Sequence, residues 1–287
     1  MSLTHANKPN FFILGAAKSG TTSLYFLLKQ HPEIFLTEEK EPTFFNDGFQ
    51  VIDNPIDYFE LYDPAADEPI RGEASHTYMS NPRSGKVLRA LFPEAKFVVI
   101  LRNPAARAHS LYHHMRRNGY EYINSFEKAI AAEDKRFACD KFKRTCTHSF
   151  YNFLYFRSGL YGQQLQHYFS IFDRSRFHVI KFEEFIADQL GHTRGILEFL
   201  GVDPDFSPEP EISNAGKITA RFPGIQYCIR RKLALPRPVR KLLMSALKRV
   251  NKTPIPPLNG ETKTMLMEKY AEDLKLLNDL TGISFTD

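Results

Sequence analysis

A short apolar strand that runs into a glycine-bearing loop and then into a helix constrains this chain more than any other feature. The apolar run is Asn10–Leu14, and Gly15 and Gly20 flank the loop. An amphipathic helix is predicted from Thr21 onward. Glycines let the backbone approach a ligand, and the N–H groups of a helix N-terminus favour an anion. The stretch Asn10–Ser23 therefore predicts a phosphate-binding loop, although a glycine turn without a ligand has the same outline.

The position of the lysine separates this loop from that of nucleotide triphosphatases. Their motif, G-x-x-x-x-G-K-[ST], has its lysine directly after the second glycine. In this chain Thr21 follows Gly20, and the only lysine, Lys18, lies inside the loop. This shift argues against an Mg-ATP hydrolase or a nucleotide kinase. It suits a donor that ends in a phosphosulfate, because a cation inside the loop can reach the bridging oxygen without a metal ion.

A second anion-binding segment follows the apolar run Lys96–Leu101. Arg102 stands directly after this predicted strand, and Ser110 follows about two helical turns later. A cation and a hydroxyl in these positions can meet over one anion at the crevice where parallel sheets bind ligands. The alternative is a capped helix with a surface arginine, because Asn103-Pro104 alone makes a good helix start.

Both segments resemble those of sulfotransferases that use PAPS (3′-phosphoadenosine 5′-phosphosulfate). The pattern K-[SA]-G-T-T-S-L is similar to their 5′-phosphosulfate loop, and R-[DN]-P…R…S is similar to their 3′-phosphate segment. The resemblance is nearest to the heparan sulfate and bacterial branch and extends from Asn10 to about Gly216. It implies PAPS as co-substrate, no metal, and in-line transfer of the sulfuryl group to a hydroxyl or amine of a carbohydrate or other natural product. A non-catalytic polyanion-binding protein is the alternative.

The resemblance also implies which residues form the site. Glu41 and Lys18 are expected to be catalytic. The residues expected to bind the donor are Lys18, Ser19, Gly20, Thr21, Thr22, Ser23, Arg102, Ser110, Gly216 and Lys217.

Glu41 is expected to be the general base. Sulfuryl transfer requires a group that takes the acceptor proton, and a carboxylate near the phosphosulfate loop can do so. In heparan sulfate sulfotransferases the base is a glutamate just before x-x-F-F, a segment that Glu41–Phe45 (EPTFF) resembles. Two alternatives stay open. Glu38, Glu39 and Glu41 can form one solvated acidic turn, and His76 can be the base, as a histidine is in the cytosolic small-molecule sulfotransferases.

One position departs from the heparan branch. Its members have E-K-[ST]-P-x-Y where this chain has Glu73–Tyr78 (EASHTY), so Ala74 replaces a lysine that faces the sulfonate. Because of this replacement, the acceptor geometry of the heparan branch is not expected in this chain. Lys40 is expected to help hold the sulfonate.

Strands that alternate with helices predict an α/β fold. We expect a single P-loop-like domain over residues 1–287, with a central parallel β-sheet flanked by helices. Its core covers about residues 10–202, and a basic, partly helical C-terminal part covers about 203–287. Helices are expected over Arg157–Phe172, Glu183–Val202 and Glu261–Gly282. Residues Asn81–Leu91 also have helical spacing, with Val87, Leu88 and Leu91 on one face. Residues 53–70 are expected to lie at the surface.

The basic charge of the chain is local. Residues 217–252 contain eleven Lys or Arg and no Asp or Glu, although the net charge of all 287 residues is only +5. This region can serve an anionic glycan, a peripheral membrane contact or solubility. No recognition motif for nucleic acid accompanies it.

The sequence indicates a soluble cytoplasmic protein. It contains no apolar run of the length that a signal peptide or a membrane span requires. Cys139 and Cys146 can pair, but reduced thiols are expected in the cytoplasm. The oligomeric state is not indicated.

Overall fold

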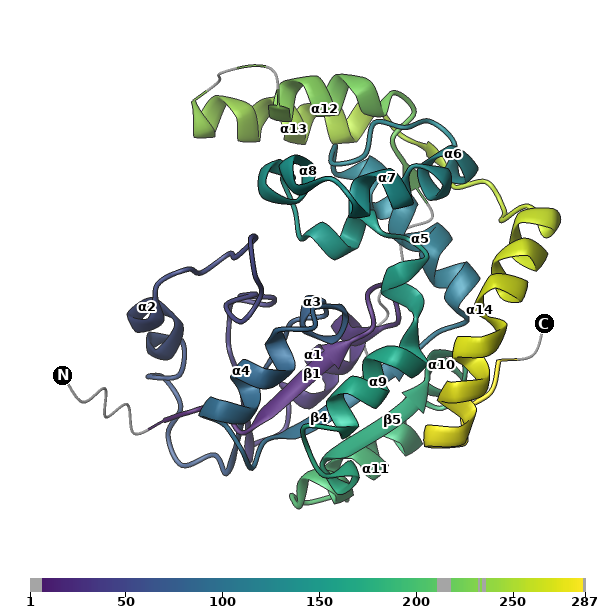
Figure 1. Ribbon diagram of the computed structural model, residues 1–287. Coiled ribbons are helices and arrows are strands. Elements are labelled where there is room, and N and C mark those ends of the chain that lie inside the picture. Colours follow the sequence, from purple (N-terminus) through teal and green to yellow (C-terminus); the bar gives the residue numbers. More distant parts are fainter. Residues whose placement is uncertain (1–6, 211–217, 232, 234–235, 286–287) are drawn as a thin grey trace. The chain divides into compact units, whose positions relative to one another are not determined.

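The computed structural model describes residues 7–210, 218–231, 233 and 236–285 (Figure 1). The chain divides into two compact units. The sheet unit comprises Met1–Asn103, Leu160–Ser213 and Ala271–Asp287, and the helical unit comprises Pro104–Gly159 and Asn214–Tyr270. The expectation of a single domain stays a prediction.

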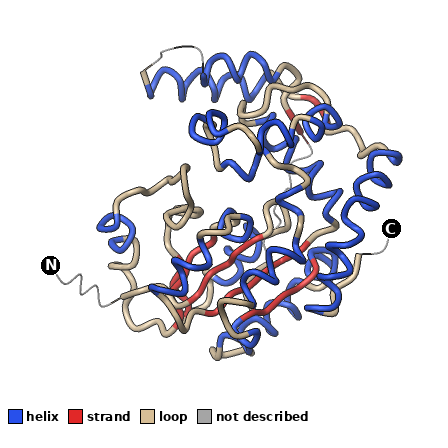
Figure 2. Tube along the Cα trace, in the orientation of Figure 1, coloured by secondary structure: helices blue, strands red, loops and turns tan. Residues whose placement is uncertain are grey.

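A five-stranded parallel sheet forms the centre of the sheet unit (Figure 2). Its strands lie in the order β2 (Ile34–Leu36), β3 (Ile70–Ala74), β1 (Phe11–Gly15), β4 (Lys96–Leu101) and β5 (Phe177–Lys181). Every neighbouring pair is parallel. The predicted α/β class with a central parallel sheet is confirmed.

Both faces of this sheet are covered, as the apolar strands predict. Successive residues of β4 join two separate apolar clusters: Phe97, Val99 and Leu101 belong to one, and Val98 and Ile100 to the other. Because successive side chains point to opposite faces and both faces are buried, such parallel strands have continuous apolar sequences.

Helices supply the covering layers. Helices α4 (Ser84–Leu91) and α9 (Tyr161–Phe169) pack on the face of Phe97, and α1 (Thr21–Leu28) and α11 (Gln189–Leu200) pack on the other. The unit also contains α2 (Pro55–Glu60), α3 (Thr77–Ser80), the 3₁₀ turn η3 (Arg174–Arg176), α10 (Phe182–Ala187) and the end of α14 (Gly260–Thr281). No helix in the described ranges combines the length and the hydropathy that crossing a bilayer requires.

The helical unit begins with α5 (Pro104–Arg117). It continues through α6 (Phe126–Ala131), α7 (Glu133–Phe137), α8 (Asp140–Thr145), η1 (Phe150–Phe153), η2 (Arg157–Gly159), α12 (Pro223–Arg231), α13 (Arg237–Val250) and the first part of α14. Strands β6 (Ile218–Thr219) and β7 (Thr253–Pro254) form an antiparallel pair.

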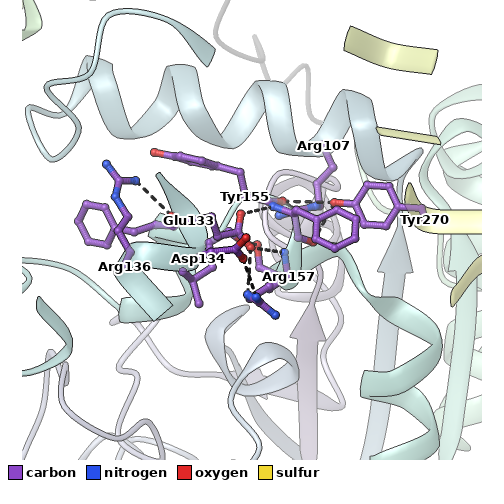
Figure 3. A network of polar contacts seen from close by, with 11 residues as sticks. Arg107, Glu133, Asp134, Arg136, Tyr155, Arg157 and Tyr270 are labelled. Carbon is purple, nitrogen blue, oxygen red and sulfur yellow. Dashed lines mark hydrogen bonds and ion pairs between the residues drawn. The ribbon is translucent and has the colours of Figure 1, made fainter. Parts of the chain in front are cut away.

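Polar side-chain contacts fix the turn before η2 (Figure 3). The Glu133 carboxylate accepts the backbone N–H groups of Phe156 and Arg157 at 2.8 and 2.7 Å. The Arg157 guanidinium pairs with Asp134 at 2.7 Å. The Tyr270 hydroxyl donates to the carbonyl of Phe156 at 2.8 Å. Side chains therefore supply hydrogen-bond partners to backbone N–H and C=O groups of this turn, which lacks the regular hydrogen bonds of a helix.

Two predicted helices have different bounds in the structure. The segment Glu183–Val202 forms α10 and α11, with a break at Asp188. The Asp188 carboxylate accepts the N–H of Gly191 at 2.9 Å and caps α11, which explains the break. The segment Arg157–Phe172 begins with η2, and its α-helix starts only at Tyr161.

One burial expectation is wrong. Tyr58 and Tyr62 are fully buried in the cluster around Phe97, although residues 53–70 were expected at the surface. In α4, Leu88 is buried, but Val87 and Leu91 are 41% and 48% exposed. The buried residues of this helix are Ser84, Gly85 and Leu88, and a Cβ added at Gly85 would lie 3.3 Å from the ring of Tyr168 in α9.

Replacing Asp188 by alanine is expected to lower the free energy of unfolding by about 1 kcal/mol, because α11 loses its cap. Urea denaturation measures the change. Glu198→Ala, an exposed ion-pair position on the same helix, is the control and is expected to change stability by at most about 0.5 kcal/mol. Equal stability of Asp188→Ala and wild type would contradict the capping role.

Candidate functional site

The predicted site residues of the sheet unit stand at one edge of the sheet. Because the strands are parallel, their carboxyl ends all meet there, which is where open α/β sheets bind ligands. Lys18 follows β1, His76 follows β3 and Arg102 follows β4, and Glu41 lies in the loop after β2.

The loop after β1 has two residues in the left-handed backbone region. Lys18 and Gly20 have positive φ values of 65° and 86°. The N–H of Ala16 donates to the carbonyl of Ile100 at 2.7 Å and ties the loop to β4. A Cβ added at Gly20 would lie 3.0 Å from the ring of Phe182, so this position requires glycine for space as well as for conformation.

The polar groups of this loop fit an anion. Gly20 is the N-cap of α1 and provides no side-chain hydrogen bond to the N–H groups of the first turn. Thr21 and Ser23 are buried and Thr22 is exposed. The hydroxyl of Ser19 is fully buried and has no hydrogen-bond partner among the described residues. A buried hydroxyl without a partner is costly, and a phosphate oxygen would supply the missing bond.

Arg102 is joined to the same loop. Its guanidinium donates to the carbonyl of Lys18 at 3.3 Å and stacks over the ring of Phe182 at 4.9 Å. The Tyr161 hydroxyl donates to the backbone carbonyl of Arg102 at 3.1 Å. The structure therefore brings the predicted arginine and the lysine loop together.

Glu41 and His76, the two rival bases of the sequence, are in contact. His76 Nδ1 lies 3.0 Å from Glu41 Oε1, and Lys40 Nζ donates to the same oxygen at 2.9 Å. Burial by itself would raise the pKa of Glu41, but His76 and Lys40 hold this pKa well below its ordinary value. The carboxylate remains ionised, and its side chain is 31% exposed. The pair also adjoins the phosphate loop, since a Cβ added at Gly15 would lie 3.4 Å from the carbonyl oxygen of His76.

Glu73 is a polar residue of this edge for which no role was predicted. It is fully buried in β3 and accepts hydrogen bonds from the hydroxyls of Tyr58, Tyr78 and Ser75 at 2.9, 3.0 and 2.5 Å. Burial raises the pKa of Glu73 to about 7, against the effect of these hydrogen bonds. A glutamate close to the end of a strand, two residues before a serine and five before a tyrosine, was the signal that could have identified it. Its neighbour Ala74 is also buried.

The remaining predicted donor residues belong to other parts of the chain. Ser110 is half-buried on α5, in the helical unit, so its pairing with Arg102 stays a prediction. Gly216 and Lys217 lie outside the described residues.

Two other polar residues of α5 are buried. Arg107 is fully buried, and although one nitrogen donates to the carbonyl of Tyr155, Nε and Nη1 have no partner in the described ranges. His113 lies against His109 at 3.0 Å, and its pKa is lowered to about 3 by burial and by His109. His113 is therefore a neutral core histidine and not a proton acceptor at neutral pH.

Comparisons with known proteins agree with this geometry. Residues 8–217 match the family model described as sulfotransferase domain. The chain is 29% identical over 220 residues to a bifunctional heparan sulfate N-deacetylase/N-sulfotransferase of Drosophila melanogaster, covering 68% of this chain and 20% of that protein. It is 36% identical over 106 residues to the membrane-associated sulfotransferase kil1 of Dictyostelium discoideum, covering 37% and 22%. The chain thus spans about a fifth of the length of these relatives.

Solved structures show the same fold. A sulfotransferase from Alicyclobacillus acidocaldarius is 28% identical, with a TM-score of 0.73 over 97% of each chain. A mouse sulfotransferase complexed with PAP is 15% identical, with a TM-score of 0.50 over 93% of this chain and 84% of that one.

The raised pKa of Glu73 predicts a pH dependence of stability. The folded protein holds a proton at Glu73 more tightly than the unfolded chain, whose glutamate titrates near 4.5. The stability from this group is therefore complete below about pH 4.5 and is lost as the pH rises through 7. Relative to Glu73→Gln, the unfolding free energy of wild type is expected to fall by about 3 kcal/mol across this window.

Urea denaturation at a series of pH values measures this difference. Glu60→Gln, at an exposed position of α2, is the matched control. If the difference in unfolding free energy between wild type and Glu73→Gln were constant from pH 4 to 8, the pKa of Glu73 would not be raised.

Proposed function

Because the chain belongs to the sulfotransferase family, we propose that it transfers the sulfuryl group of PAPS to a hydroxyl or amine of an acceptor. The observation that carries this proposal is the loop with Lys18 inside it, joined through the Lys18 carbonyl to Arg102. These two cations at one edge of the sheet suit a donor with two anionic ends. The family match over residues 8–217 supports the same reaction.

In the proposed complex each end of the donor has its own residues. The 5′-phosphosulfate is held by Lys18, by the backbone N–H groups of Ser19–Thr22 and by the loop hydroxyls, including that of Ser19. The 3′-phosphate is held by Arg102 and Ser110. Gly216 and Lys217 are proposed to complete the donor site. Fixing both phosphates positions the sulfonate for attack.

The reaction is proposed to be a direct in-line displacement. The acceptor oxygen or nitrogen forms a bond to sulfur while the bond between sulfur and the 5′-phosphate oxygen breaks. The electron pair stays on that oxygen, and Lys18 together with the loop N–H groups stabilises its developing charge. The acceptor proton passes to Glu41, which is available as a base because its low pKa keeps it ionised.

The contact between Glu41 and His76 supports one proton-accepting pair in which Glu41 takes the proton. Lys40 is bound to Glu41 and is proposed to help hold the sulfonate. The acceptor is proposed to be a carbohydrate or another natural product, and heparan sulfate N-sulfotransferases among the relatives support this class. Ala74 distinguishes this site from the heparan branch, because a buried methyl group replaces a cation.

PAP, the desulfonated donor, is expected to raise the melting temperature more than ADP, which lacks the 3′-phosphate. At a concentration about 100 times its Kd, PAP adds about 2.7 kcal/mol of stability, or roughly 5 °C or more. Thermal shift measures the effect. Lys18→Ala and Arg102→Ala are expected to reduce it, whereas Lys29→Ala at the end of α1 leaves it intact. Equal stabilisation by PAP and ADP would refute the donor assignment.

Glu41→Gln is expected to lower kcat by about 10²- to 10⁴-fold, because the acceptor proton loses its base. The PAP thermal shift is expected to stay unchanged. Transfer of radiolabel from PAPS to N-desulfated heparin and to p-nitrophenol measures turnover. Glu39→Gln, an exposed position in the same turn, is the control. Near wild-type turnover of Glu41→Gln, with loss in His76→Asn, would assign the base to His76.

A further inference from the structure

The loop that carries Glu41 has an unfavourable backbone conformation. Glu41 and Thr43 have φ values of +67° and +52°, a region that side chains other than glycine rarely adopt. Such strain persists only where the surrounding structure holds the backbone in place. The contacts that hold this loop therefore decide where the Glu41 carboxylate lies.

Two hydrogen-bond chains connect this loop to one buried carboxylate. The N–H of Thr43 donates to Ser75 Oγ at 3.2 Å, and Ser75 Oγ donates to Glu73 Oε2 at 2.5 Å. The N–H of Phe45 donates to the Tyr78 hydroxyl at 3.3 Å, and this hydroxyl donates to Glu73 Oε1 at 3.0 Å. Both chains start at the loop backbone and end on Glu73.

The direction of these bonds follows from the chemistry of Glu73. An ionised carboxylate can only accept, and each hydroxyl has a single proton. When Ser75 and Tyr78 donate to Glu73, each of them must present lone pairs to the loop. Those lone pairs are the acceptors that the N–H groups of Thr43 and Phe45 require. Tyr58 donates a third hydrogen bond at 2.9 Å and fixes the carboxylate from α2.

We propose that Glu73 is a positioning residue that sets the place of the Glu41 carboxylate through Ser75 and Tyr78. Glu73 itself is fully buried and acts through the loop backbone. This inference rests on the proposed role of Glu41 as the base. It gives the buried carboxyl group of Glu73 a function in catalysis that its packing alone would not require.

The three tyrosines around this carboxylate remain hydrogen-bond donors. Burial, followed by the charge of Glu73, raises the pKa values of Tyr58, Tyr62 and Tyr78 well above the ordinary value. Each phenol therefore keeps its proton at neutral pH. Whenever Glu73 is ionised, the Tyr78 hydroxyl therefore donates to Glu73 and accepts from the N–H of Phe45.

The test compares Glu73→Gln with wild type by amide hydrogen exchange and by kinetics. A glutamine keeps the shape of the side chain but presents an amide group that donates where the carboxylate accepts. The amides of Thr43 and Phe45 are expected to exchange at least tenfold faster, while the amide of Ala16, in the phosphate loop, is unchanged. Turnover is measured with N-desulfated heparin and p-nitrophenol as sulfuryl acceptors. The kcat is expected to fall at least tenfold, and the KM for PAPS is expected to change less than twofold.

Variants that remove one link each make the test independent of whether Glu73→Gln folds. Ser75→Ala is expected to speed exchange at Thr43, and Tyr78→Phe at Phe45. Adding Glu73→Gln to the double variant Ser75→Ala/Tyr78→Phe is expected to lower kcat no further, because the effects of substitutions within one network are not additive. Tyr270→Phe is the control: its hydroxyl is buried and bonded to backbone carbonyls, but it is outside this network. It is expected to leave both readouts unchanged.

The outcomes separate the inference from the proposed function. Unchanged exchange at Thr43 and Phe45 in Glu73→Gln would overturn the inference, and so would faster exchange with unchanged kcat. Wild-type turnover of Glu41→Gln would instead refute the proposed base. The exchange measurement would still decide in that case whether Glu73 positions the loop.

Discussion

The hydrogen bond from the Ala16 N–H to the Ile100 carbonyl holds the phosphate loop against the neighbouring strand. β4 ends one residue before Arg102, so this bond also places the arginine beside the loop, where it reaches the Lys18 carbonyl. The parallel pairing of β1 with β3 and β4 brings the other loops to the same edge. Strand pairing therefore brings the loops that carry the charged groups to one edge of the sheet, and side-chain contacts then fix the groups within it.

Two glutamates at this edge have opposite electrostatic surroundings. Glu41 lies between Lys40 and His76, which stabilise its charged form. Glu73 lies among hydroxyls in a buried position, and burial favours its neutral form. Pairs of carboxyl groups whose pKa values are separated in this way commonly divide the work of a site between them. In the proposed function, Glu41 meets the acceptor and Glu73 holds the loop on which Glu41 stands.

The sequence predicted those parts of the fold and site that local patterns encode. The apolar runs of β1, β4 and β5 and the loop around Lys18 are contiguous, and their positions were found. The contact between Glu41 and His76 was missed because β2 and β3 become neighbours only in the sheet, so two residues weighed as rivals form one pair. The roles of Glu73 and Tyr58 depend on the same long-range packing. The break at Asp188 was missed because apolar spacing continues across it.

Gly20 shows that a short motif can have a distant determinant. Its place in the loop is recognisable from neighbouring residues, but the ring of Phe182 fills the space where a side chain would be. Phe182 is the first residue of α10 and directly follows β5, the strand at the far edge of the sheet. The same ring stacks under Arg102. Transplanting this loop into another parallel sheet would therefore require transplanting the aromatic ring with it.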